Sequence, residues 1–443
     1  MKQFIIIAGI IFAHFGFSQE VENQAESKIW SLEDCITYAI ENNITLKDAE
    51  INTSISEVDY KTAKSAKLPN LFGSASQNFS SGTTIDPITS DYVSDQIHST
   101  NLGLNSSVTL FQGNQLSNQI KQNKLLIEQN SLLAQEAKNN IVINILESYL
   151  QTLFSKEGIT IAQNNLNASE KEVLRAKSRL EAGTIALSDY TEAQSQAATN
   201  KYNVIAAKND YELNIINLKQ LLELSPLEDL QIETVEENED LIHLELNKEA
   251  IYTNALSYLP EVEASNTKIL INEKELEIAK GGYLPTLSLT GSLGSGYTSI
   301  SDNTFYDQLD VNFNQRLGLS LNIPIFNRNQ TKAAVQTATF NIEKAEIQKQ
   351  TVEKEVIKKV ETAYQYALSS QEQLVAAEAS QSAAEQSYNL AQKRYELGDL
   401  STTDLVVSQN TYTNAQQNYI QSKYLNILYH QLLQFYQGNE IKL

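Results

Sequence analysis

Two very long stretches without proline constrain the fold of this chain more than any other feature. One runs from residue 113 to 182 and the other from 329 to 397, so each covers about 70 residues. At 1.5 Å per residue, a continuous helix of that length would measure roughly 105 Å. A helical pattern of this length without caps is typical of a coiled coil or a helical barrel.

Apolar residues follow the 3-4 spacing of a coiled-coil seam along these stretches and the segments after them. Many seam positions carry Ala, Asn or Gln, which permit close helix approach but bury little apolar area, at about 25 cal/mol per Å². We therefore expect each helix to need neighbours on both sides, as in a closed cylinder. The seam residues are Tyr190, Ala193, Ala197, Val204, Ala207, Tyr211, Leu218 and Leu221, then Val356, Val360, Ala363, Ala367 and Leu374, then Leu425, Leu428, Leu432 and Phe435.

The chain is internally duplicated. "RLEAGTIALSDY" at 179–190 corresponds to "RYELGDLSTTDL" at 394–405, and the Leu-Pro pair at 68–69 corresponds to the one at 284–285. The matches occur in the same order, 215 or 216 residues apart. Two copies of about 200 residues each are not a short-repeat solenoid.

Between the helices, each half contains stretches in which apolar and polar residues alternate with a period of two, which indicates β-strands. The pattern fits a soluble antiparallel sheet with one wet face, and it fits a transmembrane β-barrel with one face toward lipid. In a membrane, four strands cannot close a barrel, so they would have to come from several subunits. The stretches are 71–79, 101–111, 285–297 and 315–326, with turn-rich loops expected at 81–100 and 298–312.

The N-terminal segment and the charge bear on location and partners. Lys2 and an apolar run over 4–17 are typical of a signal peptide, which we place at 1–18. No later segment approaches about 18 uninterrupted apolar residues, so no transmembrane helix is expected after it. The formal net charge of −21 argues against nucleic acid as a partner, because a basic surface supplies that affinity.

The sequence offers no constellation for catalysis. Cys35 is the single cysteine and is expected to be a small core residue of a helix. The four histidines are dispersed, and none has a second ligand at metal-binding spacing. We expect no metal site, no cofactor and no enzymatic activity.

Each repeated corner predicts the end of one helix and the start of the next. Gly183 and Gly398 occupy positions where left-handed backbone geometry ends a helix at little steric cost. Side chains suited to cap the next helix follow, with a carboxylate at its positive end: Ser188 with Asp189, and Ser401 or Thr403 with Asp404. Arg179 and Arg394, four residues before each glycine, are not explained by capping. Exposed tips of this composition suit docking to another protein or a ring of carboxylates at a constriction.

These features together resemble the TolC-type outer membrane factors, the exit ducts of tripartite efflux pumps and type I secretion systems. The resemblance covers essentially the whole chain after the signal peptide. It depends on the two corner motifs, on the Leu-Pro strand entries, on "WSLEDCITYAIENN" at 30–43 and on "IPIFNRNQ" at 323–330.

The resemblance implies a mainly α-helical fold with a β-barrel part. Three copies would contribute four strands each to a twelve-stranded barrel in the outer membrane, and the antiparallel helices would form a hollow cylinder across the periplasm. Implied partners are the other two copies, a periplasmic adaptor protein, an inner-membrane pump of the RND, ABC or MFS type, and outer membrane lipid. Adaptor docking would fall on Arg179, Gly183, Thr184, Arg394, Gly398 and Ser401, and the periplasmic constriction on Asp189, Tyr395 and Asp404.

Two departures from the family pattern concern the gate. Leu400 stands where some members have a gate arginine, and Val407 stands one turn beyond Asp404, where a double carboxylate ring needs a second acid. Gating by an arginine clasp and strong cation binding at the ring are therefore not expected. The competing interpretation is an exported coiled-coil adhesin or scaffold without a pore.

The predicted division of the chain follows the duplication. The first repeat contains a helix, two strands and a long helical hairpin, an acidic connector leads to the second repeat, and a short tail follows. The boundaries are 1–18 for the signal peptide, 19–223 for the first repeat, 224–246 for the connector, 247–436 for the second repeat and 437–443 for the tail.

Overall fold

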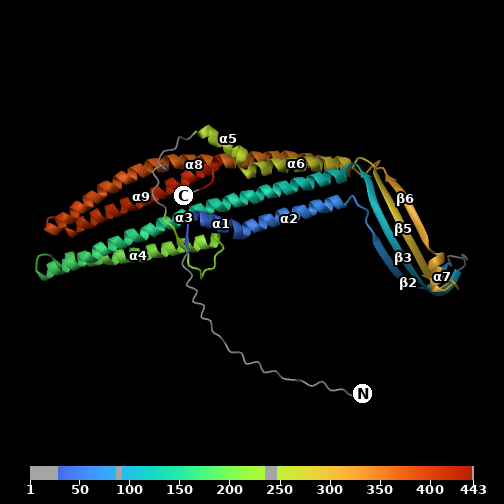
Figure 1. Cartoon of the computed structure of the whole chain (residues 1–443), viewed down its shortest axis with the longest axis horizontal. Coiled ribbons are helices and arrows are strands. Elements are labelled where there is room, and N and C mark those ends of the chain that lie inside the picture. The colour runs from blue at the N-terminus through green and yellow to red at the C-terminus, as the bar shows by residue number, and fades with distance from the viewer. Residues whose placement is uncertain (1–27, 86–91, 235–246, 442–443) are drawn as a thin grey trace, which may run out of the picture.

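The computed structural model describes residues 28–85, 92–234 and 247–441. The molecule is a long rod, with a sheet at one end and the two helical corners at the other (Figure 1). Its elements are β1 (Ile29–Trp30), α1 (Leu32–Asn42), α2 (Ile44–Ser65), β2 (Phe72–Ile85), β3 (Tyr92–Gln112), α3 (Gln115–Glu181), α4 (Leu187–Leu221), β4 (Gln231–Ile232), α5 (Lys248–Tyr258), α6 (Pro260–Gly281), β5 (Thr286–Thr298), α7 (Phe305–Val311), β6 (Asn314–Asn322), α8 (Gln330–Leu397) and α9 (Thr402–Tyr436).

The two proline-free stretches form the predicted long helices. The helix α3 contains 67 residues and α8 contains 68, so each is about 100 Å long. Towards the corners α3 pairs with α4 and α8 pairs with α9, and towards the sheet α2 lies against α3 while α6 lies between α3 and α8. Within the described residues, no helix is both long and apolar enough to cross a membrane.

The predicted coiled-coil seams are buried or half-buried. Val356, Val360, Ala363 and Ala367 are all buried along α8. Along α4 the predicted seam residues are partly buried and partly half-buried, and Asn200 is buried among them, where its Nδ2 donates to the backbone oxygen of Asn165. The small side chains in these seams permit the helices to approach closely.

The four long strands form one antiparallel sheet in the order β2-β3-β5-β6. The register places Leu289 opposite Val108 on one side and Leu319 on the other, while Thr290 lies opposite Ser107 and Gly318. Since alternate residues point to opposite faces, one face is apolar and the other carries small polar side chains. The predicted alternation is confirmed, and β2 and β6 form the two edges of the sheet.

The expected loops and strand ends were partly wrong. Strands β2 and β3 continue through most of the predicted loop 81–100, and the short helix α7 occupies much of 298–312. The strand β6 stops at Asn322, before the predicted end at 326, because Pro324 has no N–H to donate to a sheet. Polar residues in 81–100 had suggested turns, but small polar side chains are what one face of this sheet carries.

A second small sheet marks the middle of the rod. Strand β1 pairs in parallel with β4, so the start of the connector 224–246 forms a short strand, and its residues 235–246 lie outside the described structure. The side chain of Cys35 is fully buried in the core beneath this sheet, as expected, and burial raises the pKa of its thiol to about 12. The predicted signal peptide 1–18 and residues 442–443 of the tail also lie outside the described residues.

Candidate functional site at the helical corners

The first corner ends α3 with a left-handed glycine. The backbone φ of Gly183 is +73°, and its N–H donates to the oxygen of Leu180 at 2.9 Å. The N–H of Thr184 then donates to the oxygen of Arg179 at 2.9 Å, and the Thr184 hydroxyl reaches the same oxygen at 3.0 Å. A side chain at Gly183 would meet no neighbouring atom, so the positive φ alone accounts for the glycine.

The second corner repeats this backbone geometry with different side chains. Gly398 has a φ of +82°, and the N–H of Asp399 donates to the oxygen of Arg394 at 2.9 Å. The Asp399 carboxylate accepts a hydrogen bond from Nε of Arg394 at 3.1 Å, and its backbone oxygen accepts one from Nη2 at 3.2 Å. Arg394 is therefore occupied within its own turn.

The caps of the two following helices differ. Ser401 caps α9, because its hydroxyl accepts from the N–H of Asp404 at 3.2 Å and donates to the Asp404 carboxylate at 2.7 Å. The predicted cap by Ser188 was wrong: the cap position of α4 is Ala186, two residues earlier, and the helix begins at Leu187. There the Asp189 carboxylate accepts from the N–H of Ala186 at 3.3 Å, so the carboxylate alone serves the helix start.

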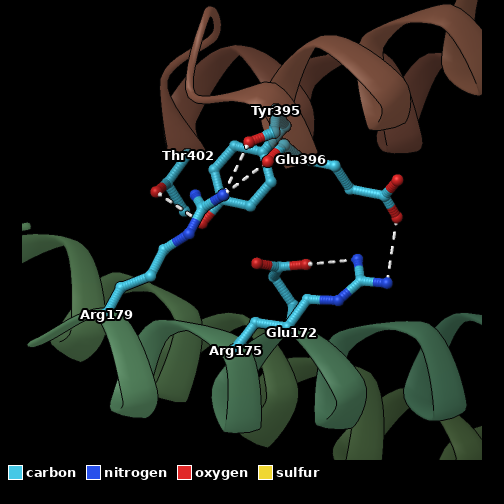
Figure 2. Close-up of polar contacts among 6 residues, drawn as sticks. All are labelled: Glu172, Arg175, Arg179, Tyr395, Glu396 and Thr402. Carbon is cyan, nitrogen blue, oxygen red and sulfur yellow. Dashed lines mark hydrogen bonds and ion pairs between the residues drawn. The ribbon is translucent and has the colours of Figure 1, made fainter. Parts of the chain in front are cut away.

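Arg179 crosses from the first hairpin to the second (Figure 2). Its Nη2 donates to the backbone oxygen of Glu396 at 2.8 Å and to that of Tyr395 at 3.2 Å. Its guanidinium carbon lies 5.2 Å from the centre of the Tyr395 ring. Carbonyl groups in the last turn of a helix lack helical partners and form its negative end, so a cation is favourable there. We refer to Arg179 with these two carbonyl groups as the cross-hairpin clamp.

An ion pair on α3 extends the contact. Arg175 donates from Nη2 to the Glu396 carboxylate at 2.9 Å and from Nη1 to Glu172 at 3.5 Å (Figure 2). The side chains of Arg175 and Glu396 are each 44% exposed, so solvent screens this pair and its share of the stability is small. The geometry nevertheless directs one positive face of α3 toward the end of α8.

Tyr395 lies beneath the clamp and is only 3% exposed. Its hydroxyl lies 3.4 Å from the Thr402 hydroxyl, which belongs to the first turn of α9. Burial raises the pKa of Tyr395 above its ordinary value, so the side chain stays neutral at physiological pH. The ring therefore joins the two helices of the second hairpin to the arginine of the first.

The structure brings together some of the residues that the sequence singled out and separates others. Arg179 and Tyr395 are in contact, whereas Asp189 and Asp404 each serve the start of a different helix. Of the predicted site residues, Arg179 and Asp189 are half-buried, and the exposed ones are Gly183, Thr184, Arg394, Gly398, Ser401 and Asp404. Their roles in docking and constriction stay predictions.

Sequence reasoning missed Glu172, Arg175, Glu396 and Thr402. Glu172, Arg175 and Arg179 are three and four residues apart, a spacing that places them on one face of α3. That charged face was a usable signal. The groups that this face binds on α8 could not be predicted, because every residue has a backbone carbonyl group and the sequence does not show which ones are accessible.

Comparison with known sequences identifies the family. Residues 35–223 and 251–430 match the family described as "Outer membrane efflux protein". The outer membrane protein TolC of Escherichia coli K12 is 24% identical over 307 residues, which cover 67% of this chain and 61% of that protein. The outer membrane efflux protein BepC of Brucella suis is 23% identical over 403 residues, which cover 89% of this chain and 82% of that protein. The chain thus matches less than two thirds of the length of the E. coli relative.

Solved structures share the fold. The CmeC outer membrane channel of Campylobacter jejuni superposes with a TM-score of 0.79 at 19% identity, covering 93% of this chain and 87% of that one. The outer membrane protein VceC of Vibrio cholerae gives a TM-score of 0.77 at 15% identity, covering 93% of this chain and 97% of that one. These likenesses show the shared fold, and the family match over both halves shows that the chain belongs to the outer membrane efflux protein family.

Proposed function

We propose that this chain is one subunit of an outer membrane exit duct, which passively conducts substrates delivered by an inner-membrane pump and a periplasmic adaptor. Membership of the outer membrane efflux protein family supports the proposal, and it places the chain in the outer membrane with its helices in the periplasm. The family is one of channels rather than enzymes. The duct adds no energy of its own, so the pump or the substrate gradient must drive transport.

The open sheet is the observation that carries this proposal. Among the described residues, strands β2 and β6 have a pairing partner on one side only. The apolar face of the sheet is exposed, with Leu317 78% and Leu319 65% accessible. Lipid tolerates an apolar face but no unpaired strand edge. Three copies of this sheet, joined edge to edge, would form a closed barrel of twelve strands, so we infer a homotrimer.

The two repeats and the connector are part of the same proposal. The family match falls in two segments on either side of residues 224–250, and both corners have the same backbone geometry. We therefore assign 19–223 and 247–436 as the two repeats, with 224–246 joining them. Each repeat contributes two strands, one long helix and one corner.

The corners are proposed as the periplasmic mouth and the docking surface of the adaptor. Both hairpins must part for the mouth to open, and the cross-hairpin clamp opposes this separation within each subunit. An adaptor can open the mouth only as far as it binds the open state more tightly than the closed one. Asp189 and Asp404 are the carboxylates that we assign to the constriction.

Conductance of the purified protein in planar bilayers tests the function. We expect single channels that prefer cations, and we expect Asp404→Asn to reduce that preference because it removes one carboxylate per subunit from the mouth. Asp48→Asn is the matched control, since Asp48 is exposed on α2, far from the corners. Protein that never conducts would overturn the duct, whereas unchanged selectivity in Asp404→Asn would remove only Asp404 from the pore.

A further inference from the structure

The duplication allows the surroundings of each element to be compared with those of its counterpart in the other half. The turns that lead from the sheet into α3 and α8 have the same backbone: φ is +56° and +61° at Gly113 and Asn114, and +56° and +62° at Arg328 and Asn329. The helices α2 and α6 likewise occupy the same place in the two repeats, 216 residues apart. The neighbours that one repeat has within the chain therefore show which neighbours the other repeat lacks.

The turn before α3 lies against the C-terminal end of α6, backbone to backbone. A Cβ built on Gly113 would lie 2.2 Å from the backbone oxygen of Gly281, and a Cβ built on Gly281 would lie 2.5 Å from the oxygen of Gly113. Both distances are far below any permitted contact, so this approach requires glycine on both sides. We call this contact the glycine junction.

Within the part of the chain that the structure describes, the counterpart of Gly281 at the end of α2 has no such neighbour. Ser65 is exposed, whereas Gly281 is buried. Further along α2, Ile51 and Ile55 are 57% and 52% exposed, while their counterparts on α6 are 1% exposed at Thr267 and 4% exposed at Ile271. The reason is that α6 packs against both α3 and α8, whereas α2 packs against α3. One side of α2 thus has no neighbouring helix among the described residues.

One side of α8 is likewise uncovered, and it could pack against the uncovered side of α2. Phe340 and Ile347 are 65% and 64% exposed, while Leu125 and Leu132, their counterparts on α3, are half-buried. Arg328 is exposed in the turn before α8. The missing neighbour of α2 is therefore a helix like α8, and the missing neighbour of α8 is a helix like α2.

We propose, on the basis of the trimeric duct proposed above, that the turn at Arg328 and Asn329 packs against the end of α2 of a partner subunit. Phe340 and Ile347 then lie over the exposed isoleucines of that helix. The contact is head to tail, with different surfaces on its two sides, and such a contact closes into a ring when it is repeated by a rotation. The partner is a second copy of this chain.

The contact between subunits is wider than the glycine junction. Arg328 stands where the first repeat has Gly113, and Ser65 stands where α6 has Gly281, so both sides of the new contact carry a Cβ. The close backbone approach inside the chain would be impossible for these residues. Around the ring, tight junctions within chains therefore alternate with wider junctions between chains, which become the places where subunits can shift against each other.

Crosslinking tests the location of the contact. In a Cys35→Ala background we would introduce Ser65→Cys together with Arg328→Cys and treat detergent-solubilised protein with a short bismaleimide. We expect covalent dimers and trimers on denaturing gels. The control pair is Lys67→Cys with Ser117→Cys, because Lys67 Nζ lies 3.1 Å from the Ser117 hydroxyl within one chain. This pair should link without a gain in mass.

The results separate this inference from the proposed function. If the native mass is that of a trimer and the control pair links, but no dimer forms through residues 65 and 328, the contact is wrong and the duct stands. A single-subunit native mass overturns both.

A reciprocal exchange tests the difference in width. We expect Arg328→Gly to assemble into trimers at the wild-type yield. We expect Gly113→Arg to lower the yield at least tenfold, because the new side chain meets the backbone of Gly281. Equal trimer yields from the two variants would contradict the proposed difference in width.

Discussion

The two corners begin with the same motif and the same backbone turn, yet their arginines act in different places. Arg394 stays within its own corner, where it binds the carboxylate and the backbone oxygen of Asp399. Arg179 instead reaches the other hairpin and binds the last carbonyl groups of α8. One arginine closes a turn, and the other joins two hairpins.

The difference originates in one position of the repeat. The residue after the glycine is Asp399 in the second corner and Thr184 in the first. The Thr184 hydroxyl is already bound to the backbone oxygen of Arg179 and offers no charge to the guanidinium. Arg179 is therefore available for the end of α8. The duplicated corners have the same backbone turn, and the side chain after the glycine decides what each arginine binds.

Removing each arginine in turn should give the largest contrast. We expect Arg179→Ala to weaken the contact between the hairpins by about 2 kcal/mol, because hydrogen bonds from a charged group are lost. Hydrogen exchange of the last turn of α8 should then rise roughly thirty-fold. We expect Arg394→Ala to change it only about two-fold, since that pair is exposed. Equal effects of the two variants would contradict the assignment of different roles.

An acidic residue after Gly183 should make Arg179 behave like Arg394 in the second corner. In Thr184→Asp, we expect Arg179 to turn toward the new carboxylate and partly release the end of α8, at a cost of about 1 kcal/mol to the contact between hairpins. The measurement is again hydrogen exchange at residues 388–398. Thr184→Asn is the control without charge, and it should leave the exchange near the wild-type rate. A release as large in Thr184→Asn would show that charge is not the cause.

The helix caps provide a smaller contrast. Ser401→Ala should destabilise the first turn of α9 by about 1 kcal/mol, because the capping hydrogen bond to Asp404 is lost. Ala186→Ser should stabilise the first turn of α4 by a similar amount. Amide exchange in each first turn reports the effect. Should Ala186→Ser give no protection, the local geometry of the first corner must exclude a cap.

The smallest expected effect concerns pH. Burial raises the pKa of Tyr395, so the closed corner keeps the hydroxyl protonated, while the open corner lets it titrate near its ordinary value of about 10. The contact between the hairpins is thus at full strength below about pH 10 and weakens as the pH rises above it. Exchange rates corrected for the intrinsic effect of pH should show this weakening. In Tyr395→Phe the pH-dependent weakening should vanish. If the weakening persists in that variant, another titratable group causes it.

Much of the architecture could be predicted because it repeats with a regular period. The absence of proline and the heptad spacing gave α3 and α8, and the alternation of Leu with small polar residues gave the strands and their two faces. The glycines at both corners were also predictable, because a helix end with positive φ strongly favours that residue.

The rest depended on contacts that carry no sequence signal. Ser188 looked like a cap, but α4 begins at Leu187 and its start relies on the carboxylate of Asp189. The clamp was missed because Arg179 binds backbone oxygens, whose position depends on how the two hairpins pack. The length of β2 and β3 was underestimated because the small polar residues of a sheet face resemble those of a turn.

The central claim is that the four strands of one chain form an open sheet that only sister chains can close. Native mass spectrometry of the full-length protein, released from detergent micelles, tests it most directly. The account predicts a mass of three subunits and no folded single subunit under conditions that keep the sheet intact. A stable, water-soluble single subunit with β2 and β6 protected from hydrogen exchange would contradict it.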